Sequence, residues 1–407
     1  MTTISDIDYT HPDTFAEGVL HEDLAALRRN SPVVWVPQEP GIGGYPDDGY
    51  WLVTSHELVR EVSRNGKLWS SWENTAMSRL QDHSAEAQVP MQRALMLNQD
   101  GTEHSDIRRI ISRGFTPRAV NGLRDALTAR ARDIAERAQA GEQGNFVAED
   151  ANELPVQAIA DLLGVPQEDR MKLLDWSDRM TGADEGHNPM DAMAELVGYS
   201  YQIAAERQAA PQDDIITKLV EANDDGRLTP EEFGYFMILL VVAGSETTRN
   251  SIGLGMIAML EHPEQWEKFK AERPETAADE IIRWASPVMS FHRTATEDTV
   301  LGGQDIQKGQ RVVMLYASAN FDEEVFDDPT TFDITRSPNP HVAFGGTGPH
   351  YCVGANLARL QVELMFNAIA DVMPDITLLG DPVRVRSGWL NSLKSFEVNY
   401  GQCPVAH

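Results

Sequence analysis

The sequence predicts a mainly α-helical fold with small peripheral β-sheets, organised as one domain over residues 1–407. Apolar residues recur at helical spacing over about 106–293 and again over about 354–372, which predicts the helical body. Short β-rich segments bounded by Pro and Gly are confined to about 30–60 and 295–320. Helix-like and strand-like segments do not alternate regularly, so a doubly wound parallel sheet is not expected.

The strand-like segments are short and lie on either side of the helical body. Residues 33–36 and 50–53 are rich in Val, Trp and Tyr, and the stretch between them is interrupted by Pro and Gly. Two more segments, 299–301 and 311–316, follow the helical body. Such isolated pieces predict small sheets at the edge of the molecule.

Composition excludes several classes of protein. The 407 residues include 63 acidic and 34 basic side chains, a formal net charge of -29, which disfavours nucleic-acid or anionic-membrane binding. The chain has two cysteines, Cys352 and Cys403, which are too few for a disulfide framework and indicate a reducing compartment. The sequence suggests no function for Cys403. No signal peptide is recognisable, and the longest apolar run, 236–243, is too short to span a bilayer. We expect a cytoplasmic protein with no transmembrane segment.

One long helix is predicted to cross the centre of the domain. Thr229 is a suitable N-cap, Pro230 suits the first helical position and Glu232 completes a capping box. The helical pattern continues to His262, roughly 48 Å at 1.5 Å per residue. Its middle is apolar on most sides, yet it contains the polar run 243–248. A buried carboxylate there indicates either a functional site or a solvated notch, and these two interpretations are equally favoured.

A glycine-rich segment surrounds Cys352. Residues 341–344 are extended, 345–354 read GGTGPHYCVG, and a helix follows. A lone cysteine is ordinarily a small buried hydrophobe. Here the glycines permit close folding over a flat ligand, and the following helix N-terminus stabilises a thiolate, the iron ligand that haem requires for O–O cleavage. A dinucleotide-binding loop is disfavoured because the G-x-G-x-x-G spacing is missing.

Four motifs together resemble the cytochrome P450 family of haem-thiolate monooxygenases. They are the central-helix run 243–248, the Glu-x-x-Arg pair at 280–283, the segment 326–336 and the cysteine loop, in the order the family shows. Phe344 lies eight residues before Cys352 where the family has seven, which implies a one-residue insertion. The resemblance implies the cytochrome P450 fold, with the long helix over the haem.

Within that family the chain is similar to actinobacterial steroid C26/C27 monooxygenases. The similarity is carried by 110–120, 318–326, the Gly-Gly-Thr-Gly loop, 387–391 and 403–407. It implies hydroxylation of the terminal side-chain methyl of cholesterol or cholest-4-en-3-one, with O2 as co-substrate. The same chemistry on a branched fatty acid or terpenoid remains an alternative. A non-catalytic haem protein that binds gas or carries electrons, or a peroxide-driven enzyme, is disfavoured because neither needs a proton relay.

The resemblance also implies roles for individual residues. The cofactor is haem b, with Cys352 as its axial metal ligand, and Glu246 and Thr247 are the catalytic pair, the acid relaying protons and the alcohol hydrogen-bonding dioxygen. The haem propionates are expected to bind His104, Arg108, Arg293 and His350. A structural ion triad is expected from Glu280, Arg283 and Arg336. The apolar walls of the substrate pocket are expected from Ile238, Val242, Ala243, Val288, Met289 and Phe291.

Electrons are expected from a separate ferredoxin and its NAD(P)H-dependent reductase, because the chain shows no reductase segment. Residues 93–137 contain nine Arg against six Asp or Glu, a local excess of three positive charges in an acidic protein. Arg109, Arg113 and Arg118 follow Arg108 within this segment. We expect this basic patch to dock an acidic ferredoxin, the alternative being an ordinary solvated helix face.

Overall fold

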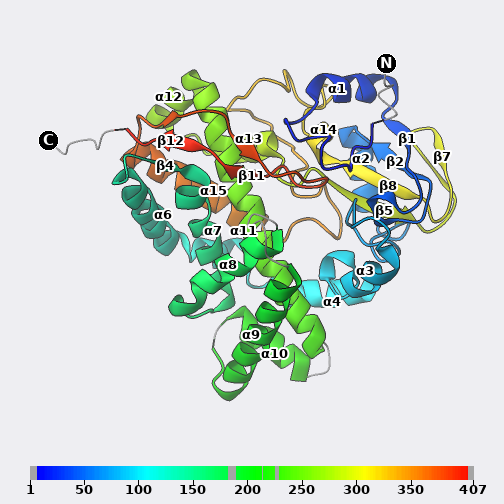
Figure 1. Ribbon diagram of the computed structural model, residues 1–407, viewed down its shortest axis with the longest axis horizontal. Helices are drawn as coiled ribbons and strands as arrows, with labels where there is room; N and C mark the ends of the chain where they lie inside the picture. The colour runs from blue at the N-terminus through cyan, green and yellow to red at the C-terminus, as the bar shows by residue number, and fades with distance from the viewer. Residues whose placement is uncertain (1–6, 182–188, 213, 225–228, 402–407) are drawn as a thin grey trace.

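The computed structural model describes residues 7–181, 189–212, 214–224 and 229–401; Cys403 lies outside these ranges. Helices form a large body on one side, and a sheet with the N-terminal segments lies on the other (Figure 1). The predicted fold class, mainly helical with small sheets, is confirmed. Among the described helices, none is long and apolar enough to cross a bilayer.

The helical body is built around α11 (Pro230–Glu261), which runs through the molecule in Figure 1. Helices α7, α8, α9, α13 and α15 pack against it. The other helices cover this centre or lie beside the sheet. The helices are α1 (His21–Asn30), α2 (His56–Arg64), α3 (Ala85–Gln92), α4 (Gly101–Ile111), α5 (Pro117–Asn121), α6 (Arg124–Gln139), α7 (Glu153–Leu163), α8 (Arg170–Thr181), α9 (Pro189–Ala209), α10 (Ile215–Asp224), α12 (Pro263–Glu272), α13 (Ala277–Ala285), α14 (Tyr316–Ala319) and α15 (Ala355–Val372).

The capping box predicted for the long helix is present. The Thr229 side chain accepts a hydrogen bond from the Glu232 backbone N–H, and the Glu232 carboxylate accepts one from the Thr229 N–H. The helix ends at Glu261 with His262 as C-cap, so both predicted ends are confirmed. Close packing requires Gly244 in its middle, because a Cβ there would overlap the Ile159 side chain of α7.

The strands form four small sheets. The largest has the order β1–β2–β8–β5–β3, in which β2 and β8 are parallel and the other pairs antiparallel. The predicted strand segments 33–36, 50–53, 299–301 and 311–316 correspond to β1, β2, β6 and β8. The strands are β1 (Val33–Pro37), β2 (Gly49–Val53), β3 (Trp69–Ser70), β4 (Gln143–Asn145), β5 (Ser290–Ala295), β6 (Thr299–Leu301), β7 (Gln304–Ile306), β8 (Arg311–Leu315), β9 (Thr377–Leu378), β10 (Val383–Arg384), β11 (Leu393–Ser395) and β12 (Glu397–Asn399).

Several strands differ from the sequence prediction. β5 begins at Ser290, inside the segment 106–293 that was expected to be helical. β4 lies inside the same segment, where it pairs with β12 near the C-terminal end of the described chain. The strands β3 and β9 to β12 were not predicted at all. Apart from β5, these strands are two or three residues long, so they carry no alternation of apolar and polar residues, and β4 and β12 are distant in sequence.

Candidate active site

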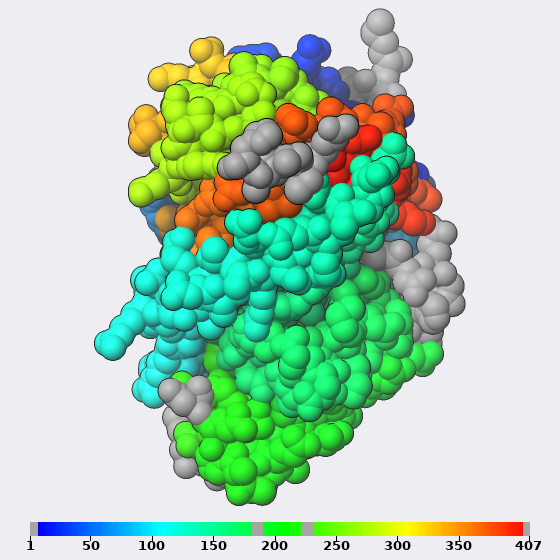
Figure 2. Space-filling view, turned by 90° about the vertical axis from the view of Figure 1, so that its left-hand side faces the viewer, coloured from blue at the N-terminus to red at the C-terminus, as the bar shows by residue number. Residues whose placement is uncertain are grey.

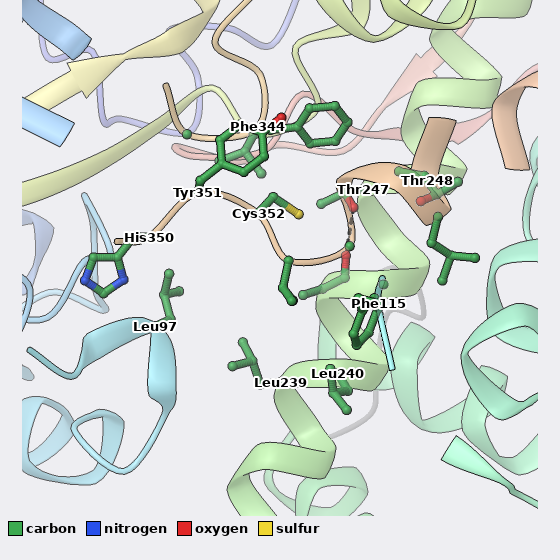
Figure 3. A pocket seen from close by; sticks show the side chains of 18 of the residues that line it. Leu97, Phe115, Leu239, Leu240, Thr247, Thr248, Phe344, His350, Tyr351 and Cys352 are labelled. Atoms are coloured by element: carbon green, nitrogen blue, oxygen red, sulfur yellow. Dashed lines mark hydrogen bonds between the residues drawn. The ribbon is translucent and has the colours of Figure 1, made fainter. Parts of the chain in front are cut away.

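A mostly apolar cavity of about 220 Å³ lies where α11, the cysteine loop, α4 and β5 meet (Figure 3). Its basic groups lie on α4, β5 and the cysteine loop, and α11 contributes the hydroxyls of Thr247, Thr248 and Ser251.

The Cys352 side chain points into this cavity (Figure 3). Its backbone N–H donates to the Phe344 carbonyl oxygen at 2.9 Å, and the Arg359 guanidinium lies 4.6 Å from the Phe344 ring centroid. Burial raises the pKa of the Cys352 thiol, while the Gly354 backbone N–H and Arg108 oppose this shift. A thiolate is therefore favoured only when a bound cation replaces its proton, as an iron ion would.

The glycine-rich part of the cysteine loop contains three residues in the left-handed region. Gly345, Gly346 and Gly348 have φ values of +91°, +69° and +89°. A Cβ on Gly348 would overlap the carbonyl oxygen of Ser63, at the end of α2, and lie 3.0 Å from Arg64 Cα. Glycine is needed there for both backbone conformation and space.

A cationic cluster of His104, Arg108, Arg293 and His350 lines the same cavity. The rings of His104 and His350 are 4.2 Å apart. Arg108 donates to the Tyr351 carbonyl oxygen at 2.6 Å, and Arg293 to that of His292 at 2.7 Å.

No member of this cluster forms an ion pair with a carboxylate within the described part of the chain. Burial lowers the pKa of His104 to about 4, and it also lowers the pKa values of His350 and Arg293. The two histidines are therefore neutral hydrogen-bonding groups, and the charge of the cluster is that of Arg108 and Arg293. Buried guanidiniums without counter-ions are unfavourable unless a ligand supplies negative charge. Together with Cys352, this donor set fits the two carboxylates and the iron of a haem.

The structure places only one of the two expected catalytic residues at the cavity. Thr247 lines it and donates its hydroxyl to the Ala243 carbonyl oxygen at 2.7 Å. Glu246 is buried and is not part of the cavity wall; its Oε2 accepts a hydrogen bond from Arg249 Nη2 at 2.7 Å. An i,i+3 ion pair along α11 therefore holds the Glu246 carboxylate on Arg249. The role of Glu246 as the proton-relaying acid stays a prediction.

Comparison with known proteins now places the chain in a family. The cytochrome P450 family model matches residues 176–370. A steroid C26-monooxygenase of Rhodococcus jostii is 57% identical over 98% of this chain and 87% of its own length. The chain belongs to the cytochrome P450 family. A steroid C26-monooxygenase of Mycobacterium tuberculosis is 53% identical over 98% of this chain and 94% of its own length.

Two further cytochrome P450 relatives are more distant. A methyl-branched lipid omega-hydroxylase of Mycobacterium tuberculosis is 36% identical over 98% of this chain and 95% of its own length. The structure of a Mycobacterium marinum cytochrome P450 in complex with pseudoionone superposes with a TM-score of 0.86 at 34% identity, covering 95% of this chain and 96% of that one.

Three of the six predicted pocket residues lie at the cavity of this P450. Ala243, Val288 and Phe291 line it. Ile238, Val242 and Met289 do not, so their expected place in the wall is wrong. Ile238 and Val242 lie on other sides of α11 and pack into the helical core, and Met289 packs into the cluster beside β2 and β8.

Several residues of the wall were missed. Leu239 and Leu240 precede Ala243 by one helical turn on α11, so helical spacing could have found both. Tyr316 and Gln361 also line the cavity of this P450 but come from the start of α14 and from α15. No local pattern identifies these two, because only the tertiary fold brings them to the site.

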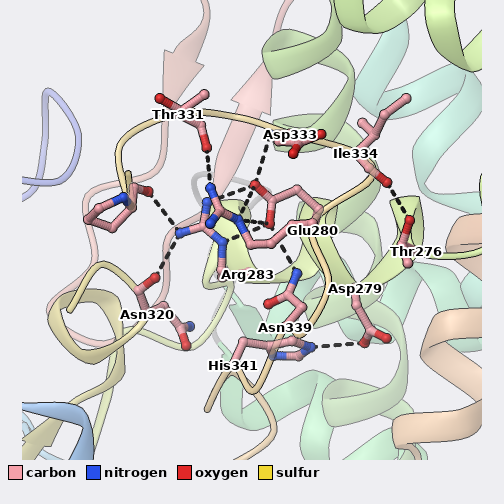
Figure 4. A network of polar contacts seen from close by, with 12 residues as sticks. Thr276, Asp279, Glu280, Arg283, Asn320, Thr331, Asp333, Ile334, Asn339 and His341 are labelled. Carbon is pink, nitrogen blue, oxygen red and sulfur yellow. Dashed lines mark hydrogen bonds and ion pairs between the residues drawn. The ribbon is translucent and has the colours of Figure 1, made fainter. Parts of the chain in front are cut away.

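The predicted ion triad is assembled and supports the cysteine loop (Figure 4). The Glu280 carboxylate is 2.8 Å from Arg283 Nε and 3.1 Å from Arg336 Nε, and Glu280 and Arg283 are fully buried. Arg283 also donates to the Asn320 carbonyl oxygen at 2.8 Å, and the Asn320 side chain accepts from the Val342 N–H at 2.7 Å. The triad thus fixes the chain that leads into the P450 cysteine loop.

Proposed function

We propose that this protein is a steroid C26-monooxygenase that hydroxylates the terminal side-chain methyl of cholesterol or cholest-4-en-3-one. Supporting this are the 53% and 57% identities, over nearly the whole chain, to proteins of that activity. The observation that carries the chemistry is one cavity bounded by the Cys352 thiol, the cationic cluster and an apolar wall of α11.

The protein's own groups have distinct tasks in this proposal. Haem b, held by Cys352 and by the cationic cluster around its propionates, supplies the activation of O2. The Thr247 hydroxyl presents a hydrogen-bond donor and acceptor at the cavity wall, where a proton is needed. Phe236, Leu239 and Leu240 exclude water and hold an aliphatic chain by shape, which is how attack on an unactivated methyl is directed.

The proposed chemistry is tested by absorption and by product analysis. Carbon monoxide added to the reduced protein should give the red-shifted Soret band of thiolate ligation, and Cys352→His should lose it. Titration with cholest-4-en-3-one or cholesterol should displace the iron-bound water and shift the Soret band. Mass spectrometry should then detect a product hydroxylated at the terminal methyl.

A branched lipid is the second candidate substrate, favoured by the 36% identity to a methyl-branched lipid omega-hydroxylase. Both substrates present a terminal methyl at the end of an apolar chain, so the apolar wall alone does not separate them. A spectral shift and turnover with a methyl-branched fatty acid, and neither with a sterol, would refute the steroid proposal.

For the electron donor we propose an acidic ferredoxin, itself reduced by an NAD(P)H-dependent reductase. Arg109, Arg113 and Arg118 are exposed. Arg109 forms an ion pair with Asp106 at 2.8 Å. These residues belong to the segment from α4 to α6 that crosses the face in Figure 2 beside α15. Arg108 of α4 contacts Tyr351, so this surface borders the cysteine loop.

Charge reversal tests this docking surface. The double variant Arg109→Glu/Arg113→Glu should slow reduction by ferredoxin at low salt, with the difference shrinking as salt is added. Arg386→Glu is the matched control, since Arg386 is also exposed but pairs with Asp13 in the segment before α1. Equal reduction rates in the wild type and the double variant would refute the surface.

A further inference from the structure

The segment 387–391, one of the stretches that resemble steroid C26/C27 monooxygenases, is fastened to the chain that precedes β5. The Trp389 carbonyl oxygen accepts a hydrogen bond from the Met289 N–H at 2.8 Å. The Asn391 N–H donates to the Pro287 carbonyl oxygen at 3.0 Å. Backbone hydrogen bonds at both ends therefore couple the position of this segment to that of the chain before β5.

The chain held in this way supplies apolar residues to the cavity. Val288 lines the cavity and pairs with Leu390 in an isolated antiparallel bridge. Phe291 also lines the cavity, and its ring stacks on that of Trp389 with the centroids 6.2 Å apart. A displacement of the segment 389–391 would therefore move two residues of the cavity wall.

The N-terminal segment of the described chain is in close contact with this support at Gly388. A Cβ on Gly388 would overlap the Thr10 carbonyl oxygen and lie 3.3 Å from Cδ of Arg79. The φ of Gly388 lies outside the left-handed region, so packing alone requires glycine at this position. The Thr10 carbonyl oxygen therefore limits how far the chain at Gly388 can move.

The Thr10 carbonyl oxygen is held in place through Asp8. The Asp8 carboxylate accepts hydrogen bonds from the Thr10 N–H at 2.9 Å and from the Thr10 hydroxyl at 2.7 Å. It also accepts from the Tyr50 hydroxyl of β2 at 3.0 Å and from Arg79 at 3.1 Å. Because hydrogen bonds to a carboxylate are stronger than neutral ones, they anchor Thr10 to the large sheet.

We infer that Asp8 and Gly388 are positioning residues for the substrate wall of the cavity. Asp8 fixes the Thr10 carbonyl oxygen, this oxygen fixes the chain at Gly388, and the segment 389–391 fixes the wall. A wall held in this way keeps the aliphatic end of the substrate in one orientation, as selective attack on a terminal methyl requires. The inference rests on the proposed monooxygenase function, because that substrate is the one the wall holds.

Titration with cholest-4-en-3-one tests Gly388→Ala. No side-chain rotation relieves the overlap of the added Cβ with the Thr10 backbone, so the chain has to shift. We expect the dissociation constant from the Soret shift to rise at least about threefold, and some product to carry the hydroxyl away from the terminal methyl. Haem content and the carbon monoxide spectrum should stay as in the wild type.

Gly144→Ala is the matched control for crowding. Its Cβ would overlap the Glu149 carboxylate, and both residues lie outside the described cavity wall. It should lower Tm without changing sterol binding or the position of hydroxylation. Wild-type sterol binding and product in Gly388→Ala, or equal changes in Gly388→Ala and Gly144→Ala, would overturn the inference.

Asp8→Ala tests the anchor without adding volume to the contact. Alone it should weaken sterol binding about twofold, because the wall loses its support, and unchanged binding would overturn the inference. In the double variant Asp8→Ala/Gly388→Ala, the released Thr10 can move away from the added Cβ. Sterol should therefore bind more tightly to the double variant than to Gly388→Ala. Additive losses would show that the two residues act separately and would overturn the inference.

Failure of the inference is distinguishable from failure of the proposed function. If a methyl-branched fatty acid shifts the Soret band of the wild type and no sterol does, the steroid proposal fails. The same comparisons made with that fatty acid then decide whether Asp8 and Gly388 position the wall.

Discussion

Replacing Gly348 by Ala isolates the packing requirement of the cysteine loop. Gly348 and Gly309 have nearly the same φ, +89° and +87°, but an added Cβ has nothing within 4 Å at Gly309. Left-handed strain alone costs about 1–2 kcal/mol. At Gly348 the overlap with the Ser63 backbone adds about 1–3 kcal/mol, since no side-chain rotation relieves it.

These energies translate into measurable melting temperatures. An unfolding entropy of about 2.1 cal/mol/K per residue over 407 residues means that ~1 kcal/mol shifts Tm by about 1.2 °C. We expect Gly309→Ala to lower Tm by about 1–2 °C and Gly348→Ala by about 2–6 °C. Only Gly348→Ala should reduce the haem bound per protein, measured by Soret absorbance. Equal Tm shifts and equal haem content in the two variants would refute the packing argument.

Three further substitutions test other parts of the fold. Glu280→Ala leaves Arg283 buried without its carboxylate and should destabilise the protein by about 3–5 kcal/mol, seen as a lower Tm; an unchanged Tm would contradict this. Thr229→Ala removes the capping box and should cost about 1 kcal/mol in denaturant unfolding, with no change in the spectral response to sterol. Burial, and then the charge of Arg28, lower the pKa of His21 in the folded protein to about 4. In the unfolded chain the pKa is about 6.5, so the unfolded chain binds a proton there before the folded protein does. The stability of the fold is therefore fully present above about pH 6.5 and falls as pH drops toward 4. His21→Gln should therefore reduce the fall in Tm between pH 7 and pH 4, and an unchanged pH dependence would show that His21 is not responsible.

Features set by neighbours in sequence were predictable. The α11 capping box joins Thr229 to Glu232, and its spacing is visible in the sequence. The Cys352 loop was likewise recognisable from its glycines and the helix that follows. The pairing of β4 with β12 was not, because it joins residue 143 to residue 399 through strands too short to show a period. Tyr316 and Gln361 were missed for the same reason, since their place at the cavity depends on packing between distant elements.

The direction of the Glu246 side chain shows where sequence motifs stop being informative. A motif fixes which residue types occur side by side on a helix, and Thr247 faces the cavity as its position on α11 requires. The carboxylate beside it is directed by Arg249, and Arg249 is held by Asp178, 71 residues away in the chain. The motif therefore identifies the acid, and the tertiary structure decides which way the acid points.

Three groups of buried charge among the described residues differ in how they are compensated. Around Glu280, the guanidiniums of Arg283 and Arg336 share one carboxylate and donate their other hydrogens to backbone carbonyl oxygens, so no ligand is needed and the group is structural. The cationic cluster has no carboxylate partner among the described residues, so its charge is balanced only when an anionic ligand binds. Around Arg249 there are two carboxylates, those of Glu246 and Asp178, so the protein itself balances this cation. The presence of a carboxylate partner within the protein therefore separates the structural charges from those that bind a ligand.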